Sequence, residues 1–135
     1  MRNTRVATIY VDRPFVEVFE FLGNPVHFPE WAGLPGSTVE HIEEFDWLVE
    51  VPSGQLVLRV SPKNDFGILD LDYAILPPGA ECGPVNSARL IPNDDGCDLI
   101  LLMYQNPGIS DEQFQSDVDW MESDLQRMKS LLELR

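Results

Sequence analysis

The chain has 135 residues, 44% of them hydrophobic, and a formal net charge of -14 at pH 7. A chain of this length can bury a core without disulfide bonds or a metal, so we expect one domain spanning residues 1–135. The negative charge repels phosphate groups, so no nucleic acid is expected as a partner. No apolar run approaches the ~18 residues of a membrane span, and the N-terminus lacks the apolar segment of a signal peptide. We therefore expect a soluble, cytoplasmic protein.

The first third of the chain combines one strand with two short helices. Residues 4–11 are β-branched and mostly apolar, which predicts a strand. Residues 12–22 predict a helix in which Asp12 is the cap and Pro14 lies in the first turn. Its apolar side chains follow helical spacing at Phe15, Val18, Phe19 and Leu22. Residues 24–32 predict a second short helix before Gly-rich residues break the chain.

The middle of the chain is a succession of predicted strands separated by Pro, Gly, Asn and Asp. They cover residues 37–45, 46–52, 55–62, 68–76, 85–91 and 98–105. The tetrapeptide NDDG, at residues 93–96, is typical of a hairpin turn. Short connections favour antiparallel neighbours, because a parallel pair needs a crossover of about a dozen residues or more.

The C-terminal segment predicts one long amphipathic helix from Ser110 to about Leu134. Pro107 and Gly108 break the preceding segment, and Ser110 with Gln113 forms a capping-box pattern. An apolar stripe with steps of three and four residues runs along the helix through Phe114, Val118, Met121, Leu125, Met128 and Leu132. The heptad-like pattern is too short for a coiled coil, so the partner of the stripe is expected within the chain. The sequence therefore predicts an α+β fold in which a curved antiparallel seven-stranded sheet holds this helix over its concave face.

Three segments resemble the START-related superfamily (SRPBCC), which includes polyketide cyclase-like and lipid-transfer proteins. They are residues 11–34, residues 64–75 and residues 106–133, and together they follow the expected order over nearly the whole chain. The resemblance implies the helix-grip, or Bet v 1-like, fold. The matching positions are Pro14, Trp31, Gly67, Pro107, Gly108, Ser110, Phe114, Trp120, Leu125 and Glu133. The subgroup that the chain resembles most has a histidine after the position of Asp70, whereas this chain has Leu71.

Few residues suggest catalysis or metal binding. Cys82 and Cys97 fit neither a CxxC nor a zinc spacing and are expected to be reduced thiols. His27 and His41, the two histidines, belong to no HExxH or paired metal motif and are interpreted as structural. No motif indicates a cofactor, no metal ligands are assigned, and no catalytic residue is identified.

Several polar residues of the predicted strands are candidate site residues. Asp70 and Asp72 alternate with apolar residues, so both are expected to face solvent. Arg59 and Arg89 alternate in the same way, and solvent exposure is favoured for each, although either could hold a polar group inside a cavity. Tyr73 is the best polar lining candidate because its ring can pack while its hydroxyl seeks a partner.

The resemblance implies a cavity between the sheet and the C-terminal helix, in which methionines adapt to varied apolar shapes. We therefore predict that the protein binds a small hydrophobic molecule, such as a lipid, polyketide-like or aromatic compound. The predicted ligand-binding residues are Trp31, Trp47, Leu71, Tyr73, Arg89, Leu101, Phe114, Val118, Met121 and Leu125. Two alternatives remain open at this point: a polyketide cyclase or dehydratase with Tyr73, His41 or an inward arginine as the polarising group, and a chaperone-cofactor-like protein-binding domain.

Self-association is also predicted from the segment 97–105. Its two alternating sets of side chains are both largely apolar, so one set packs under the helix and the other faces outward together with Thr8 and Tyr10. An apolar patch of this kind is typical of an interface. A homodimer through the outer face of the sheet is expected.

Overall fold

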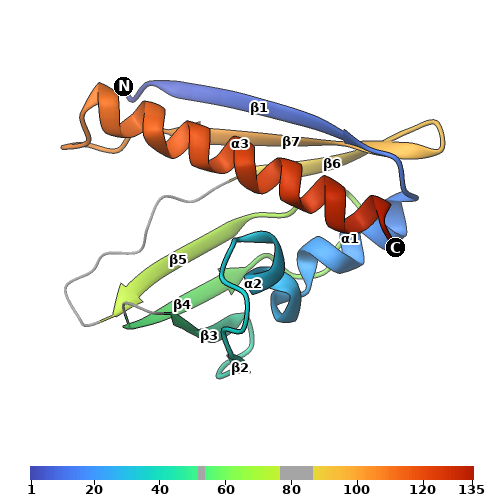
Figure 1. The fold of residues 1–135 in the computed structure, drawn as a ribbon, viewed down its shortest axis with the longest axis horizontal. Coiled ribbons are helices and arrows are strands. Elements are labelled where there is room, and N and C mark those ends of the chain that lie inside the picture. The colour runs from blue at the N-terminus through green and yellow to red at the C-terminus, as the bar shows by residue number, and fades with distance from the viewer. Residues whose placement is uncertain (52–53, 77–86) are drawn as a thin grey trace.

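The computed structural model describes residues 1–51, 54–76 and 87–135, with side chains for all of these except residues 72–76. Figure 1 shows the elements in chain order. They are β1 (Thr4–Val11), α1 (Phe15–Gly23), the 3-10 helix η1 (Pro25–His27), α2 (Phe28–Trp31), β2 (Val39–His41), β3 (Asp46–Val51), β4 (Gly54–Val60), β5 (Leu71–Leu76), β6 (Ser87–Asn93), β7 (Gly96–Tyr104) and α3 (Asp111–Glu133). The predicted order of strands and helices is confirmed for the described residues.

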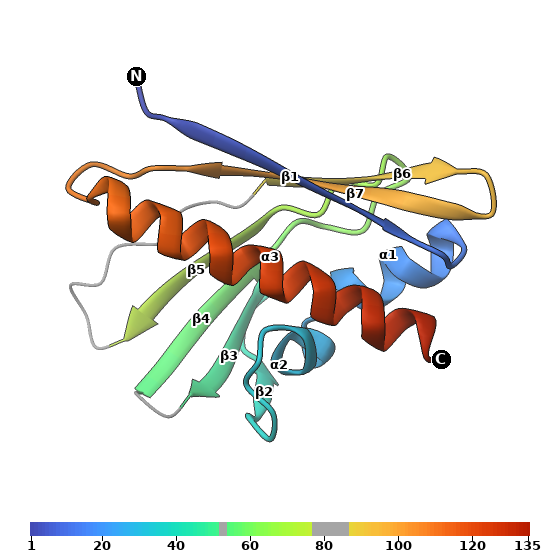
Figure 2. The ribbon, with the colours of Figure 1, turned by 45° about the horizontal axis from the view of Figure 1, so that its top comes forward.

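The strands form two antiparallel sheets, so the prediction of one continuous seven-stranded sheet needs correction. Within the described residues, one sheet has the order β1-β7-β6 and the other the order β2-β3-β4-β5. The two sheets splay apart, and α3 runs across the space between them (Figure 2). One isolated bridge between Ile68 and Arg89 connects the sheets in the described part of the chain.

The chain passes from one sheet to the other at residues 67–71, which divides the predicted strand 68–76 into two parts. The Leu90 amide donates to the Gly67 carbonyl at 2.8 Å, and the Leu69 amide donates to Ala88 at 2.9 Å, so this part pairs with β6. From Leu71 onward the chain pairs with β4 instead. Gly67 has a φ of +75°, and a Cβ there would lie 2.0 Å from the Leu90 carbonyl oxygen, so only glycine allows the close approach.

The N-termini of the two main helices differ in how they are capped. Ser110 caps α3 as predicted, because its hydroxyl accepts from the Gln113 amide at 3.1 Å, whereas the Gln113 side chain donates to Asp117 at 2.8 Å. The predicted Asp12 cap of α1 is wrong. Pro14 is the N-cap residue of α1 and makes no side-chain cap, and the Asp12 amide donates to Glu133 at 2.9 Å. Asp12 is thus part of the contact between β1 and the end of α3.

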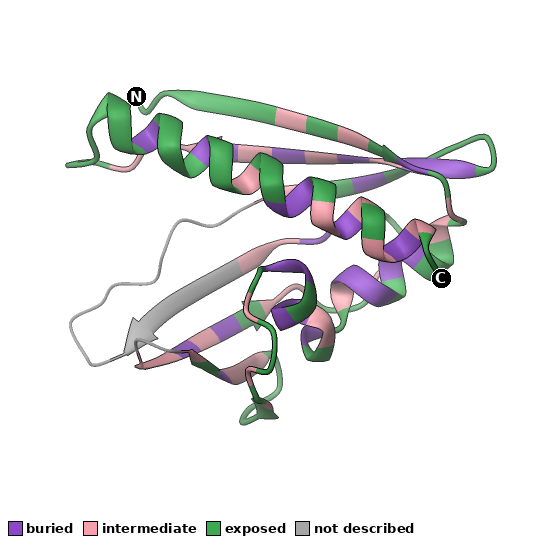
Figure 3. Cartoon of the chain, viewed as in Figure 1, coloured by how far each residue is buried: buried purple, intermediate pink, exposed green. Residues whose placement is uncertain are grey.

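The apolar stripe of α3 lies against the sheets, as predicted. Phe114, Val118, Leu125, Met128 and Leu132 are buried, and Met121 is half-buried. Figure 3 shows these buried positions alternating with exposed turns of the helix. The stripe is divided between two core clusters: Phe114 and Val118 pack with Leu101 and Met103 of β7, while the last three residues join the main cluster with α1, α2 and β4.

Strand β7 alternates in burial, and its outward face is only partly covered. Cys97, Leu99, Leu101 and Met103 are buried, while the side chains between them are half-buried. On the same outer face Val6 is 63% exposed, and Tyr10 and Ile91 are each 38% exposed. The apolar outer face is present, and the homodimer inferred from it stays a prediction. None of the described helices combines the length and apolar character needed to cross a bilayer.

Candidate functional site

A cavity of about 250 Å³ lies between α3, α2 and the two sheets. Its walls are mostly apolar. The sheets contribute Leu56, Leu58, Val60, Leu69, Leu71, Ala88, Leu99 and Leu101, and the helices and their connections contribute Leu22, Phe28, Trp31, Ala32, Leu34, Met121, Leu125 and Met128. A cavity with this lining is typical of sites for small apolar molecules.

Five of the ten predicted ligand-binding residues line this cavity. They are Trp31, Leu71, Leu101, Met121 and Leu125. They come from α2, β5, β7 and α3, so residues separated by up to 94 positions meet at one site (Leu125 minus Trp31). The middle of the α3 stripe is the part that faces the cavity.

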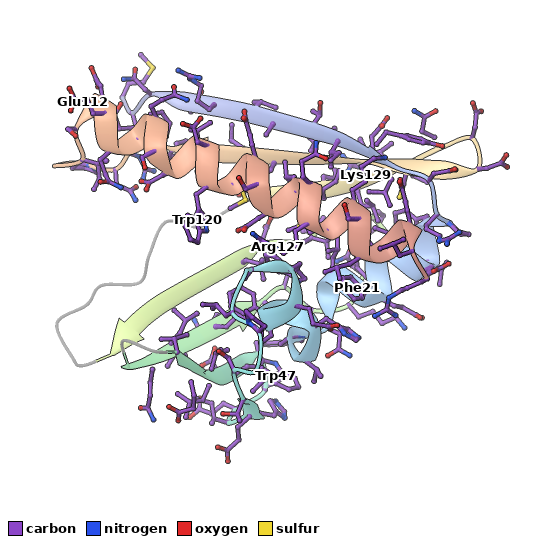
Figure 4. The ribbon with its side chains drawn as sticks, viewed as in Figure 1. Phe21, Trp47, Glu112, Trp120, Arg127 and Lys129 are labelled. Carbon is purple, nitrogen blue, oxygen red and sulfur yellow. The ribbon has the colours of Figure 1, made fainter. Side chains whose placement is uncertain are left out.

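Four of the other five predicted residues are placed elsewhere. Phe114 and Val118 are buried in the smaller core cluster against β7. Trp47 of β3 stacks on His41, with ring centroids 4.6 Å apart, away from the cavity lining (Figure 4). Arg89 is exposed, and its Nε donates to the Phe66 carbonyl at 3.3 Å. The side chain of Tyr73 lies outside the described residues.

The expectation that Asp70 faces solvent is wrong, because Asp70 is half-buried and lines the cavity. Its Oδ1 accepts from the Ala88 amide at 3.3 Å, where the chain leaves β6 just before β5 begins, and its own amide donates to the Ser61 hydroxyl oxygen at 3.1 Å. The strict two-residue alternation fails here because the chain changes sheets at this residue. The side chain of Asp72 is outside the described residues.

Trp120 marks the edge of the cavity. It lines the cavity and is nevertheless 65% exposed. In Figure 4 its side chain projects from α3 towards β5. Sequence analysis missed this role because Trp120 lies beside the apolar stripe rather than on it. A large exposed aromatic residue flanking a buried stripe is the signal that could have identified it.

Asp124 is the buried charged residue of the described chain, with an exposed fraction of 5%, and it lines the cavity next to Leu125. Its Oδ1 accepts from Nη1 of Arg127 at 2.7 Å, and the same Nη1 donates to the Trp31 carbonyl at 2.9 Å. Burial raises the pKa of the Asp124 carboxyl, and the bond and charge of Arg127 oppose that shift. The pair therefore connects α3 to α2 at the cavity wall.

Nothing in the sequence distinguished Asp124 from the other acidic residues of α3. Its neighbours Glu122 and Ser123 are exposed. The spacing of three residues between Asp124 and Arg127 was the available signal, although such pairs are common on exposed helix faces.

The other polar groups considered as site residues lie away from the cavity lining. Arg59 pairs with Asp46 across β3 and β4, with Nε 2.7 Å from Oδ1. His27 lies 2.6 Å from a Glu30 carboxylate oxygen. Burial is the main cause that raises the pKa of the Cys97 thiol to about 11, while Cys82 lies outside the described residues. No cluster of three or more potential metal-ligating side chains occurs in the described parts of the chain.

Solved structures with the same fold exist despite low sequence identity. Ara h 8.0201 aligns over all of both chains with a TM-score of 0.73 and 10% identity. Protein MLL2253 from Mesorhizobium loti aligns over 97% of each chain with a TM-score of 0.71 and 15% identity. DynU16, a protein of the dynemicin biosynthetic locus, gives a TM-score of 0.68 and 16% identity over 96% of this chain and 47% of its own.

No protein-family model matches the sequence, and no curated protein matches it. At these identities the structural likeness concerns the fold alone. The chain has a Bet v 1-like α+β fold, with antiparallel sheets and a long C-terminal helix.

Proposed function

We propose that the protein binds a small hydrophobic molecule in the cavity between α3, α2 and the sheets. The observation that supports this most directly is the cavity itself, about 250 Å³ in volume and lined mainly by aliphatic and aromatic side chains. The partly exposed Trp120 at its edge gives an apolar molecule a side chain to contact on entry. Met121 and Met128 provide adaptable walls.

Burial of apolar ligand surface would supply most of the affinity. At roughly 25 cal/mol per Å², burying about 200 Å² of ligand surface is worth about 5 kcal/mol before the entropic cost of association. This term alone corresponds to a dissociation constant of about 0.2 mM, so weak binding is expected for a small ligand, and tighter binding requires more buried surface or polar contacts.

Saturable binding of the neutral dye N-phenyl-1-naphthylamine, followed by fluorescence, tests this proposal. One dye per protein is expected, and Met121→Trp should weaken binding at least about tenfold, because the larger side chain occupies the cavity. Ser130→Trp is the matched control, since Ser130 lies on the exposed face of α3 and the variant adds the same indole outside the cavity. Non-saturable binding, or equal weakening by both variants, would eliminate the ligand-binding proposal.

The enzyme alternative receives less support from the placement of its candidate groups. His41 is stacked on Trp47, and both Arg59 and Arg89 lie away from the cavity lining. The protein-binding alternative requires a defined apolar docking surface and a partner protein. No observation on the described residues favours a particular partner. We therefore put forward ligand binding as the single function.

A further inference from the structure

We propose that the cavity selects ligands whose polar group donates a hydrogen bond, a hydroxyl or an ammonium group, and that Asp124 accepts it. This inference rests on the proposed ligand-binding function and specifies the chemistry of its ligand. It starts from the polar groups of the cavity wall. Among the described lining residues, the side chains with polar oxygen atoms are Ser61, Asp70 and Asp124, and both ionisable groups are acids.

Asp124 has one oxygen atom available for a ligand. Its Oδ1 is bonded to Arg127, and Oδ2 takes part in none of the hydrogen bonds found among the described residues. Among the described residues, the buried side-chain polar atom without a hydrogen-bond partner is Nε1 of Trp31, and Oδ2 of Asp124 is not such an atom. Since Oδ2 also has no partner, it must be partly accessible, although Asp124 as a whole is 95% buried (100% minus an exposed fraction of 5%) and lines the cavity. A ligand donor could reach it there.

Asp70 and Ser61 already make hydrogen bonds close to residues 67–71, where the chain passes from one sheet to the other; we call this segment the fork. Asp70 Oδ1 accepts from the Ala88 amide, and the Ser61 hydroxyl donates to the Ile68 carbonyl at 3.2 Å while accepting from Asp70. The Asp70 carboxylate adds negative potential to the wall. Asp124 is left as the better acceptor for a ligand.

Arg127 does not reverse the sign of the wall, because it lies behind Asp124. Its guanidinium donates to the Trp31 carbonyl and lies 3.2 Å from the position that a Cβ on Gly33 would occupy, and Arg127 is not among the lining residues. In Figure 4 its side chain extends from α3 towards α2. An anionic ligand such as a fatty-acid carboxylate would have to bring its charge beside two acids, inside a protein of net charge -14.

Four probes on one ring system separate these chemistries at neutral pH. They are 2-naphthol, 2-methoxynaphthalene, 2-(aminomethyl)naphthalene as its cation, and 2-naphthoate, each used to displace N-phenyl-1-naphthylamine. We expect 2-naphthol to bind about tenfold more tightly than its methyl ether, and 2-naphthoate to bind more weakly than the ether. Whichever of the hydroxyl and the ammonium probe binds more tightly identifies the donor that the site prefers.

The variant Asp124→Asn tests the role of the side chain. Asparagine retains an acceptor for Arg127 but presents an amide donor in place of Oδ2, so the preference for 2-naphthol over 2-methoxynaphthalene should fall about tenfold and could invert. A purely structural role in joining α2 to α3 would weaken both probes equally. Glu122→Gln makes the same charge change at an exposed position of α3 and should leave the ratio unchanged.

The selectivity of the unmodified protein keeps the inference falsifiable if Asp124→Asn does not fold. Equal affinity for 2-naphthol and 2-methoxynaphthalene, or tighter binding of 2-naphthoate than of the ether, overturns the inference while ligand binding stands. Absence of binding for every probe and for the dye overturns both proposals.

Discussion

The two sides of α3 contact the rest of the molecule in different ways. Towards the three-stranded sheet the helix makes contact near both ends: Phe114 and Val118 join Leu101 and Met103 in a core cluster, and Lys129 donates to the Tyr10 carbonyl at 2.7 Å. Between these contacts a shallower hollow separates the middle of α3 from β1. Towards the four-stranded sheet the same helix faces a cavity. One apolar stripe therefore serves both as core and as cavity wall.

The difference arises from how the sheets are joined. The chain leaves β6 at Asp70 and continues into β5, and within the described residues the sheets are connected by the bridge at Ile68 and Arg89. A helix whose first turns pack against one of two splayed sheets cannot also reach the other sheet with ordinary side chains. The remaining space is the cavity, and four changes test or sharpen this comparison.

The largest effect is expected on the closely packed side. Val118→Asp places an unpaired carboxylate at a position that is 4% exposed, and it should lower the free energy of unfolding by about 4 kcal/mol or more. Ser123→Asp, on the exposed face, should change it by less than about 0.5 kcal/mol. Denaturant titration measures both, and equal losses would show that the assigned facing of the helix is wrong.

The junction of the sheets is the next most sensitive place. Gly67→Ala puts a Cβ against the Leu90 carbonyl oxygen in a positive-φ conformation and should cost about 3 kcal/mol. Gly36→Ala shares the positive φ but has nothing within 4 Å of the added Cβ, so its cost should be about 1 kcal/mol. Thermal unfolding of the two variants compares them directly. A larger loss of thermal stability in Gly36→Ala than in Gly67→Ala would contradict the close approach of Gly67 to Leu90 as a feature that holds the two sheets together.

A smaller, pH-dependent effect is expected where α3 ends beside β1. The Asp12 amide, followed by Lys129, holds the pKa of Glu133 below its ordinary value of 4.5. A lowered pKa in the folded state means that the stabilisation is present above pH 4.5 and is lost as the pH falls through the folded value.

Glu133→Gln should therefore lower stability by less than about 1 kcal/mol at neutral pH, since the site is partly exposed to solvent. The difference from the unmodified protein should disappear in acid. Urea unfolding across the acidic range measures it, with Glu122→Gln as the exposed control on the same helix. A difference that persists at low pH would mean that Glu133 contributes through packing rather than through its charge.

The smallest effect concerns the outer face of the β1-β7-β6 sheet, which lies opposite the helix. The predicted homodimer should tighten as salt screens the repulsion between chains of net charge -14, and Val6→Glu should weaken it without affecting stability. Sedimentation at low and moderate ionic strength measures the association. A monomer under both conditions, at tens of micromolar protein, would rule out this interface.

The sequence by itself determined the local elements. The NDDG turn and the apolar run after it identified β7, helical spacing identified α3 and its buried stripe, and Ser110 was correctly identified as its cap. These features depend on neighbouring residues, because burial on one face repeats with the period of the strand or helix. Three of the five predicted residues that line the cavity, Leu101, Met121 and Leu125, lie on these two elements.

Only the tertiary structure decided which part of each stripe lines the cavity and which part is solid core. Val118 and Leu125 have equivalent spacing in the sequence, yet one packs against β7 and the other faces the cavity. The structure likewise brought Asp70 and Asp124 into the cavity wall, from positions 54 residues apart (124 minus 70). The physical reason is the fork at Gly67 to Leu71: where two sheets separate depends on long-range pairing between β4, β5 and β6, which no local periodicity encodes.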